Sequence, residues 1–198
     1  MPDTKFEDIA TTPGICEVSW YAPTTGSGAP SLLIEVPHGA TRPADFHDLR
    51  ARLTGALPDQ LDHFFYVNTD IGAPECAVWL AEALAALGHG VLVLRCAVPR
   101  TFIDCNRVAA GAVAGVMTDG MTPAVASYIT EPADRALLES LHFRYHELVA
   151  RAYTRVWSKM SGAERAKYLY RIARIIQERG RELAVLESID NGKPIKES

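Results

Sequence analysis

Three polar side chains in the middle of the chain have types and a spacing that suit the binding of an anion. Asp104, Asn106 and Arg107 follow a short β-prone run at 101–103. Arginine offers a rigid donor fork that matches a carboxylate, and asparagine can both donate and accept hydrogen bonds. One interpretation is therefore a cradle for a small acidic molecule, in which Asp104 orients the arginine. The other is a structural Asp–Arg pair closing a strand end, and the residue types alone favour it slightly.

Two further polar residues follow predicted strands. His38 comes directly after an apolar run at 31–36 that ends at Pro37, and Asp70 follows a run at 64–67. Open α/β sheets bind ligands beyond the carboxyl ends of their strands, and a neutral imidazole there suits a metal ion. The alternative for His38 is a loop histidine that caps backbone groups.

A pair of histidines lies further along the chain. His142 and His146 are four residues apart, so they share one face of a predicted helix that starts near 130. This spacing suits two metal ligands, but the glutamate of an H-E-x-x-H motif is missing, which makes the signal weak. We expect one of the two to point toward the site and the other to be a surface or core residue.

The elements that must position these residues alternate between strands and helices. Short strands are predicted at 16–21, 31–36, 64–67 and 91–94, helices at 73–87 and from 130 to 149, and either a helix or two turns at 44–57. A strand, a helix and a second strand in succession form a crossover unit, which predicts a parallel pair and an α/β fold. Residues 108–127 are predicted to form a long loop over the site.

Composition limits the class of protein. The chain has 198 residues, a net charge of −4 and no separate basic patch before Arg144, which argues against a nucleic-acid partner. No apolar run approaches the roughly 20 residues that span a bilayer, so no membrane partner is expected. The cysteines show no CxxC spacing and no secretory signal precedes them, which predicts reduced thiols and a cytoplasmic location. They are Cys16, Cys76, Cys96 and Cys105.

Four segments together resemble the N-formylglutamate amidohydrolase family over about residues 15–155. They are Glu-Val-Pro-His-Gly at 35–39, Thr-Asp-Ile-Gly-Ala-Pro-Glu-Cys-Ala at 69–77, Pro-Arg-Thr-Phe-Ile-Asp-Cys-Asn-Arg at 99–107 and Phe-Arg-Tyr-His at 143–146. The resemblance implies a zinc carboxypeptidase/aspartoacylase-like fold, an α/β three-layer sandwich with a mainly parallel sheet. It also implies hydrolysis of N-formyl-L-glutamate to formate and glutamate in histidine degradation.

The resemblance assigns roles to residues already singled out. It makes Arg100, Asn106 and Arg107 the binders of the carboxylate of a small acidic N-acyl amino acid. It implies a divalent metal ion, zinc, that polarises the formyl carbonyl and activates a water molecule. The implied metal ligands are His38 and Asp70, with Glu75, Asp104, His142 and His146 as further candidates, while no residue is assigned as the general base.

The C-terminal part of the chain departs from that family. The family's second histidine-bearing motif is not found, and the segments at 157–179 and 183–194 instead resemble early helices of an aldehyde dehydrogenase. They carry none of that family's catalytic cysteine, glutamate or cofactor-binding motifs. Ser161 and Glu164 form a capping box, and Gly180 marks a break between two helices. An apolar stripe follows the capping box at Tyr168, Leu169, Ile172, Ile175 and Ile176.

The predicted organisation is therefore an incomplete amidohydrolase-like domain at 1–155 and a helical tail at 156–198. The first hypothesis is an enzyme, a metal-dependent amidohydrolase acting on an N-acylated acidic amino acid, and whether it is inactive through loss of its C-terminal half stays open. The second is a non-catalytic folded remnant or interaction protein that self-associates through its C-terminal helices. A third, weaker hypothesis is an aldehyde dehydrogenase fragment.

Overall fold

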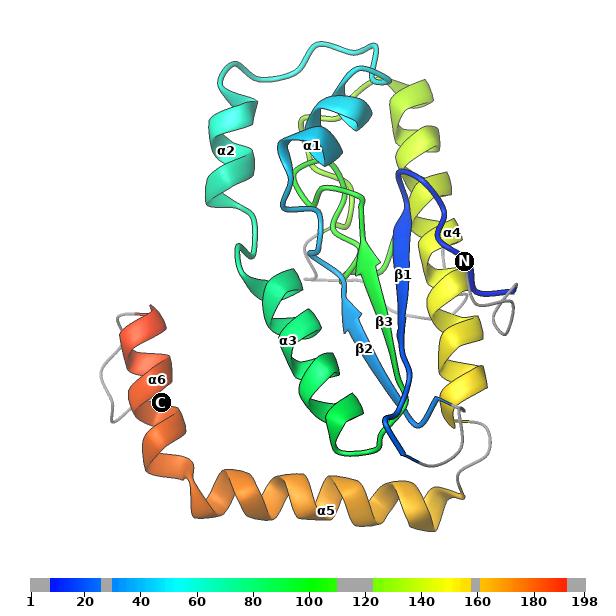
Figure 1. Cartoon of the computed structure of the whole chain (residues 1–198). Coiled ribbons are helices and arrows are strands. Elements are labelled where there is room, and N and C mark those ends of the chain that lie inside the picture. Colours follow the sequence, from blue (N-terminus) through cyan, green and yellow to red (C-terminus); the bar gives the residue numbers. More distant parts are fainter. Residues whose placement is uncertain (1–7, 26–29, 110–122, 158–160, 192–198) are drawn as a thin grey trace. The chain divides into compact units, whose positions relative to one another are not determined.

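A computed structural model describes residues 8–25, 30–109, 123–157 and 161–191 (Figure 1). The chain divides into two compact units, residues 1–157 and residues 158–198, which are described separately below. In the described residues no helix is long and apolar enough to cross a membrane.

The first unit is built on a three-stranded mixed sheet with the strand order β1-β3-β2. Its strands are β1 (Cys16–Tyr21), β2 (Leu32–Val36) and β3 (Val91–Cys96), and these confirm three of the predicted strands. β1 runs antiparallel to β3 with Cys16 opposite Cys96, whereas β2 runs parallel to β3 with Leu32 opposite Val91. Every residue of β3 is buried, as expected for a continuous apolar run at the centre of a sheet.

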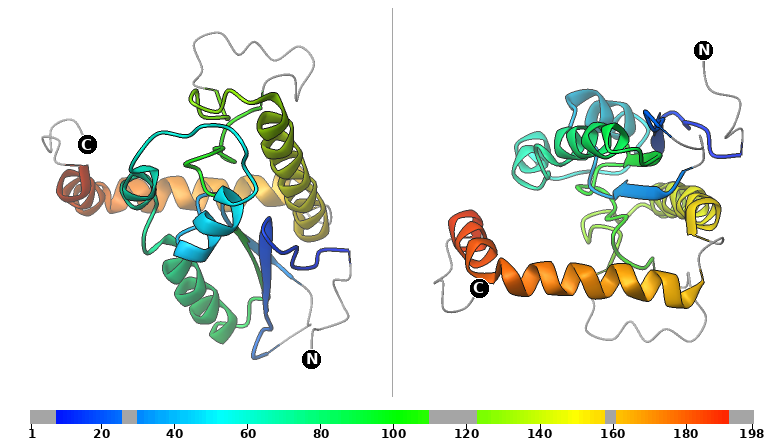
Figure 2. Two further views of the ribbon diagram at one scale, coloured as in Figure 1. Left: turned by 90° about the horizontal axis from the view of Figure 1, so that it is seen from above. Right: turned by 60° about the horizontal axis from the view of Figure 1, so that its bottom comes forward.

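Helices cover both faces of this sheet (Figure 2). Alternate side chains of β3 point to opposite faces. Val91 and Val93 pack with Ala77 and Ala81 of α3 (Ala73–Ala86), while residues on the other face pack against α4 (Pro132–Trp157). Small alanines on α3 let that helix lie close to the sheet. The first unit is thus a small mixed α/β domain, and its likeness to the zinc carboxypeptidases stays a prediction.

Two short helices precede α3, and one of them corrects a prediction. They are α1 (Pro43–Arg50) and α2 (Leu61–Val67), so the strand predicted at 64–67 is wrong. Leu61 and Phe65 are four residues apart and both buried, and the Phe65 ring centroid lies 5.1 Å from that of Phe46 in α1. This helical spacing outweighs the β-prone composition of the run. The crossover through α3 therefore joins β3 to β2.

One other predicted segment differs from expectation, and another falls mostly outside the described residues. Residues 101–103 form a turn, and an isolated bridge between Ile103 and Val125 replaces the predicted strand. Most of the loop predicted at 108–127 lies outside the described residues, which exclude 110–122.

The second unit contains α5 (Gly162–Glu178) and α6 (Gly180–Asn191). The predicted capping box is confirmed, because the Glu164 backbone N–H donates to Ser161 Oγ at 3.2 Å and the Ser161 backbone N–H donates to Glu164 Oε2 at 2.8 Å. The predicted stripe is exposed at Leu169, Ile172, Ile175 and Ile176, and the Tyr168 side chain lies outside the described ones.

Candidate functional site

A charged cluster lies beyond the carboxyl ends of the parallel strands β2 and β3. His38 follows β2, Asp70 stands in the connection to α3, and Arg100 and Asp104 lie in the turns after β3. Because parallel strands end at the same edge of a sheet, these separate segments converge there. The structure brings together His38, Asp70 and Asp104, three residues that the sequence analysis named as metal-ligand candidates.

His38 lies between two carboxylates. Its Nδ1 is 3.0 Å from Asp70 Oδ2, and its Nε2 is 2.7 Å from Asp104 Oδ1. The His38 and Asp104 side chains retain only 11% and 8% of their exposure, whereas Asp70 retains 48%. The His38–Asp104 hydrogen bond is therefore the protected one of the two.

This geometry changes the pKa values of the buried pair. The hydrogen bond to Asp104 raises the pKa of His38, against the opposing effect of burial, and favours an imidazolium that donates from both ring nitrogens. Burial by itself would raise the pKa of Asp104, but the hydrogen bonds from His38 and from the Asn106 backbone N–H lower it below its usual value. Both shifts favour the charged forms of the two side chains.

The arginines predicted to bind a carboxylate lie on either side of Asp104. Arg100 Nη1 is 3.3 Å from Asp70 Oδ1 and its Nη2 is 3.6 Å from Asp104 Oδ2, while Arg107 Nε is 3.2 Å from Asp104 Oδ2. The structural Asp104–Arg107 pair therefore exists. Only the Nε edge of Arg107 faces Asp104, and more than a third of its side chain, 37%, stays exposed.

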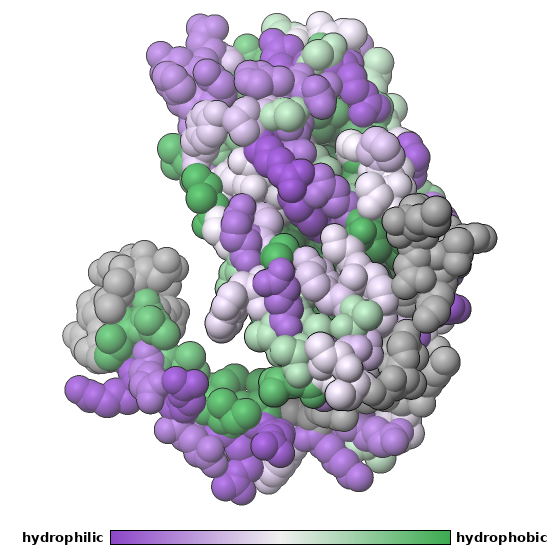
Figure 3. Space-filling view, in the orientation of Figure 1, coloured by the Kyte–Doolittle hydropathy of each residue, from purple (hydrophilic) through white to green (hydrophobic). Residues whose placement is uncertain are grey.

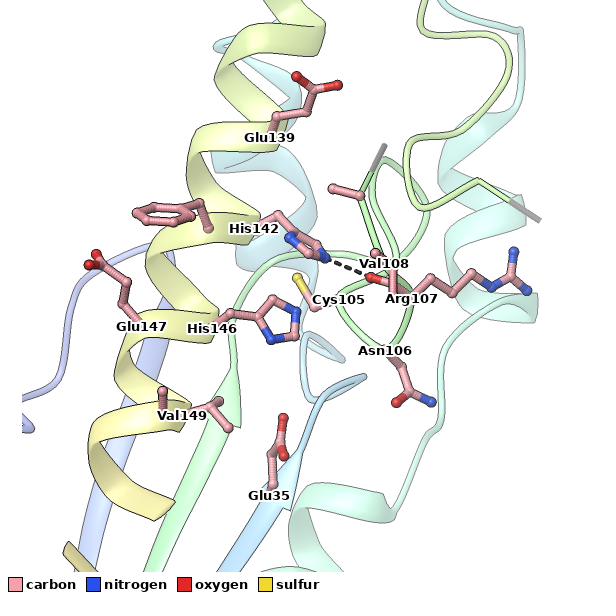
Figure 4. Close-up of a pocket in the computed structure, with 13 residues that line it drawn as sticks. Glu35, Cys105, Asn106, Arg107, Val108, Glu139, His142, His146, Glu147 and Val149 are labelled. Carbon is pink, nitrogen blue, oxygen red and sulfur yellow. Dashed lines mark hydrogen bonds between the residues drawn. The ribbon is translucent and has the colours of Figure 1, made fainter. Parts of the chain in front are cut away.

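A pocket of about 710 Å³ adjoins this cluster, between α4 and the segment that follows β3 (Figure 4). Asn106, Arg107, His142 and His146 all line it, together with Glu35 of β2. Of the residues predicted to bind a carboxylate, Asn106 and Arg107 border this space.

The two histidines of α4 differ in their contacts. His142 Nε2 donates to the Arg107 carbonyl oxygen at 2.7 Å, and the rings of His142 and His146 are 4.3 Å apart. Burial lowers the pKa of His142, so it is neutral at pH 7. It holds the backbone of the segment that carries Arg107, and this contact joins α4 to the site.

Sequence reasoning missed one contact in the pocket. The hydroxyl of Tyr145, a fully buried residue, donates to Glu35 Oε1 at 2.9 Å. Burial and the nearby Glu35 carboxylate raise the pKa of Tyr145, so it remains a donor. The available signal was a glutamate in the otherwise apolar β2 and a tyrosine at helical spacing from Leu141 and Leu148.

Glu75 does not join the cluster. It lies in the first turn of α3 and lines a separate groove of about 330 Å³ with Trp79 and Glu82. It is therefore not a metal-ligand candidate in this structure.

The donor set does not fit a metal ion. Both ring nitrogens of His38 face carboxylate oxygens, which leaves neither lone pair directed at a shared point. Over the described ranges, no group of at least three His, Cys, Asp or Glu residues is arranged to hold a metal ion. The role of His38 and Asp70 here is to form an ion pair.

Comparison with known proteins relates the C-terminal part of the chain to one family. Residues 145–198 match the aldehyde dehydrogenase family. Rat 4-trimethylaminobutyraldehyde dehydrogenase is 51% identical over 49 residues, which are 25% of this chain and 10% of that protein. Betaine aldehyde dehydrogenase of Rhizobium etli (strain CIAT 652) is 34% identical over 85 residues, covering 34% of this chain and 18% of the relative. No solved structure matches the chain.

These matches correct the functional prediction. The family and the relatives named above are aldehyde dehydrogenases, and the comparisons give no support to the N-formylglutamate amidohydrolase resemblance. The predictions of an amidohydrolase and of a zinc cofactor are therefore wrong. The match begins within α4, before the boundary between the two units.

Proposed function

We propose that residues 145–198 act as an aldehyde dehydrogenase segment whose helices dock on an apolar protein surface, and that this docking is the protein's contribution to aldehyde oxidation. The match of these residues to the aldehyde dehydrogenase family carries the proposal. The chain spans 10% to 18% of the length of the relatives named above, so their activity is transferred here only as part of this proposal.

The form of the second unit supports a docking role. Leu169, Ile172 and Ile176 recur on one side of α5 and remain 60%, 52% and 52% exposed. Figure 3 shows hydrophobic side chains gathered along one long side of this unit and hydrophilic ones along the other. Isolated helices of this length are marginal in water, so such a stripe stabilises the helix only when another surface covers it.

The expected gain from docking is substantial. Burying one Leu or Ile side chain completely contributes roughly 1.5–3 kcal/mol. With about half of each side chain still exposed, the four apolar residues of the α5 stripe offer about 3–6 kcal/mol.

A segment exchange tests this proposal. Residues 145–198 replace the matching segment of the rat 4-trimethylaminobutyraldehyde dehydrogenase, and oxidation of 4-trimethylaminobutyraldehyde is measured. We expect a soluble, active chimaera, and loss of activity when Leu169→Asp and Ile172→Asp are added. A soluble chimaera that is equally active with and without the two aspartates would show that the stripe does not dock.

A second candidate function concerns the first unit, which we propose binds a small carboxylate beside Asn106 and Arg107. The supporting observation is that 37% of the Arg107 side chain stays exposed while Asp104 fixes its Nε edge. Arg107→Lys keeps the charge but removes the planar fork, so glutamate binding measured by calorimetry should weaken about tenfold or more. Equal binding by the variant and the parent would leave only the structural Asp104–Arg107 pair.

A further inference from the structure

The pocket between α4 and the segment that follows β3 lies beside an edge strand of the sheet, β2. Every residue of β3 is buried, whereas Val36 is the only buried residue of β2, so the edge strand is less completely covered. Glu35 of β2 and the facing side of α4 line the space, whose volume is about 710 Å³. A volume of this size is typical of pockets that bind small molecules.

The carboxylate of Glu35 is fixed on one side by a buried hydroxyl. Its Oε1 accepts the hydrogen bond from Tyr145 at 2.9 Å, and Tyr145 is 0% exposed. Over the part of the chain that the structure describes, Glu35 Oε2 accepts no hydrogen bond. Figure 4 shows the carboxylate directed into the pocket, and Glu35 is an exposed residue. A molecule that binds to Oε2 must therefore bring a donor, because an ionised carboxylate only accepts hydrogen bonds.

The charges around the pocket are mainly negative. Glu139 and Glu147 of α4 line it together with Glu35, and its one lining arginine or lysine among the described residues is Arg107. The Arg107 guanidinium extends away from the pocket in Figure 4. Glu147 forms only a long ion pair with Arg151, at 3.9 Å, so it keeps most of its effect on the pocket. A cleft lined by one sign of charge attracts the opposite sign, which here means a cation.

Much of the remaining lining is apolar. The apolar side chains are those of Val108, Ala109, Phe143, Val149 and Ala150. Phe143 is 62% exposed, which is a large free surface for an aromatic ring. Covering such surface is favourable, so the lining selects a cation that also carries an apolar group.

A second acceptor stands on the segment that follows β3. Asn106 lines the pocket, and its side-chain oxygen can accept a hydrogen bond. Two contacts hold this segment in place, because the Asn106 backbone N–H donates to Asp104 Oδ1 at 2.9 Å and His142 donates to the Arg107 carbonyl oxygen at 2.7 Å. The pocket therefore presents acceptors from two different elements.

We propose that this pocket binds a small organic cation, a protonated primary or secondary amine that carries an apolar group. The ammonium donates to Glu35 Oε2, and the apolar group packs against the side of α4 that carries Phe143. Hydrogen bonds between charged partners of this kind are the strong ones. The site is distinct from the carboxylate site proposed beside Arg107, and it does not depend on docking of the second unit.

Binding of benzylamine by the full-length protein tests this proposal. Benzyl alcohol is its neutral counterpart and phenylacetate its anionic one, while benzyltrimethylammonium keeps the positive charge but has no N–H. Affinities are measured by calorimetry at neutral pH, where benzylamine is protonated. We expect benzylamine to bind about tenfold more tightly than each of the other three compounds. In NMR spectra of the parent, the amide shifts that change should centre on Glu35, Asn106 and His146.

A variant with its matched control locates the cation. Glu35→Gln keeps an acceptor for the Tyr145 hydroxyl but removes the charge, so benzylamine binding should weaken about tenfold or more. Glu82→Gln also removes one exposed carboxylate, but Glu82 lines the separate groove beside α3. This control should bind benzylamine like the parent.

Four results would each overturn the proposal. The first is a parent that does not bind benzylamine at millimolar concentration, or binds phenylacetate equally well. The second is equal binding by the parent and Glu35→Gln, which would leave Glu35 only its structural bond to Tyr145. The third is an equal loss in Glu82→Gln, which would show attraction to the net charge of −4. The fourth needs no variant and is a set of shift changes in the parent that centres outside the pocket.

Discussion

Replacement of Gly39 by alanine is a direct test of how the strand ends place the charged cluster. Gly39 follows His38 and lies against the end of β3. A Cβ at this position would be 2.6 Å from Arg95 Cγ, 2.9 Å from the Cys96 carbonyl oxygen and 3.0 Å from the Val36 carbonyl oxygen. Two of these neighbours are backbone atoms, and Arg95 is buried, so none can move aside cheaply.

The expected cost follows from this crowding. Overpacking of a well-packed site typically costs about 1–3 kcal/mol. For a protein of this size each kcal/mol lowers the melting temperature by about 2–4 °C, so Gly39→Ala should melt about 2–12 °C below the parent. Because His38 is the adjacent residue, its contact with Asp104 should loosen as well, and the pKa of His38 should fall.

The assay is thermal unfolding followed by near-ultraviolet circular dichroism, with the His38 titration followed by NMR. Gly180→Ala is the matched control, because a Cβ there would meet nothing within 4 Å. It should leave melting of the first unit unchanged. A Gly39→Ala protein that melts with the parent and keeps the parent pKa of His38 would refute the close approach of β2 and β3 at this edge.

Three further substitutions have defined outcomes. The pKa of His38 is raised in the folded state, so its contribution to the stability of the folded protein is fully present below about pH 6.5 and is lost as the pH rises through the folded-state pKa. The urea midpoint of the parent should therefore decline between about pH 5 and about pH 9, and His38→Gln should abolish this decline. An unchanged decline in the variant would contradict the assignment. Tyr145→Phe removes the donor to the exposed carboxylate of Glu35 and should lower the free energy of unfolding by about 1 kcal/mol, measured in urea; a stability equal to the parent would show that the bond contributes nothing. Ser161→Ala removes the α5 N-cap at a cost of about 1 kcal/mol and should reduce helicity at 162–178 in NMR shifts while β3 is unaffected; unchanged shifts in α5 would argue against the capping box.

The sequence predicted those elements in which the hydrophobic periodicity and the residues at the ends indicate the same structure. Examples are β1, α3 with Pro74 in its first turn, and α5, which starts at a capping box. Prediction failed at 64–67, where β-prone residue types conflicted with the helical spacing of Leu61 and Phe65. For such a short run, only the tertiary contact of Phe65 with Phe46 decides between a helix and a strand.

The candidate site was predicted in position but not in chemistry. A strand end located His38 correctly, because the edge of a parallel pair is implied by the order of elements. Asp70 and Asp104 were placed there through strands at 64–67 and 101–103 that the structure does not contain. Whether a histidine near two acids binds a metal or forms ion pairs depends on where its ring nitrogens point, and residue types do not encode that direction. The contact from His142 to the Arg107 backbone also depends on the packing of α4, which sequence spacing left open.

Hydrogen exchange tests the central claim, that the second unit is a docking unit, most directly. In the protein alone the amides of 162–191 should exchange much faster than those of Val91–Cys96, because the α5 stripe is exposed while β3 is buried throughout. In the chimaera with the rat dehydrogenase, where another surface covers the stripe, the amides of α5 should become protected. Protection of α5 equal to that of β3 in the protein alone would contradict the account, because the second unit would then be a permanent layer of one domain.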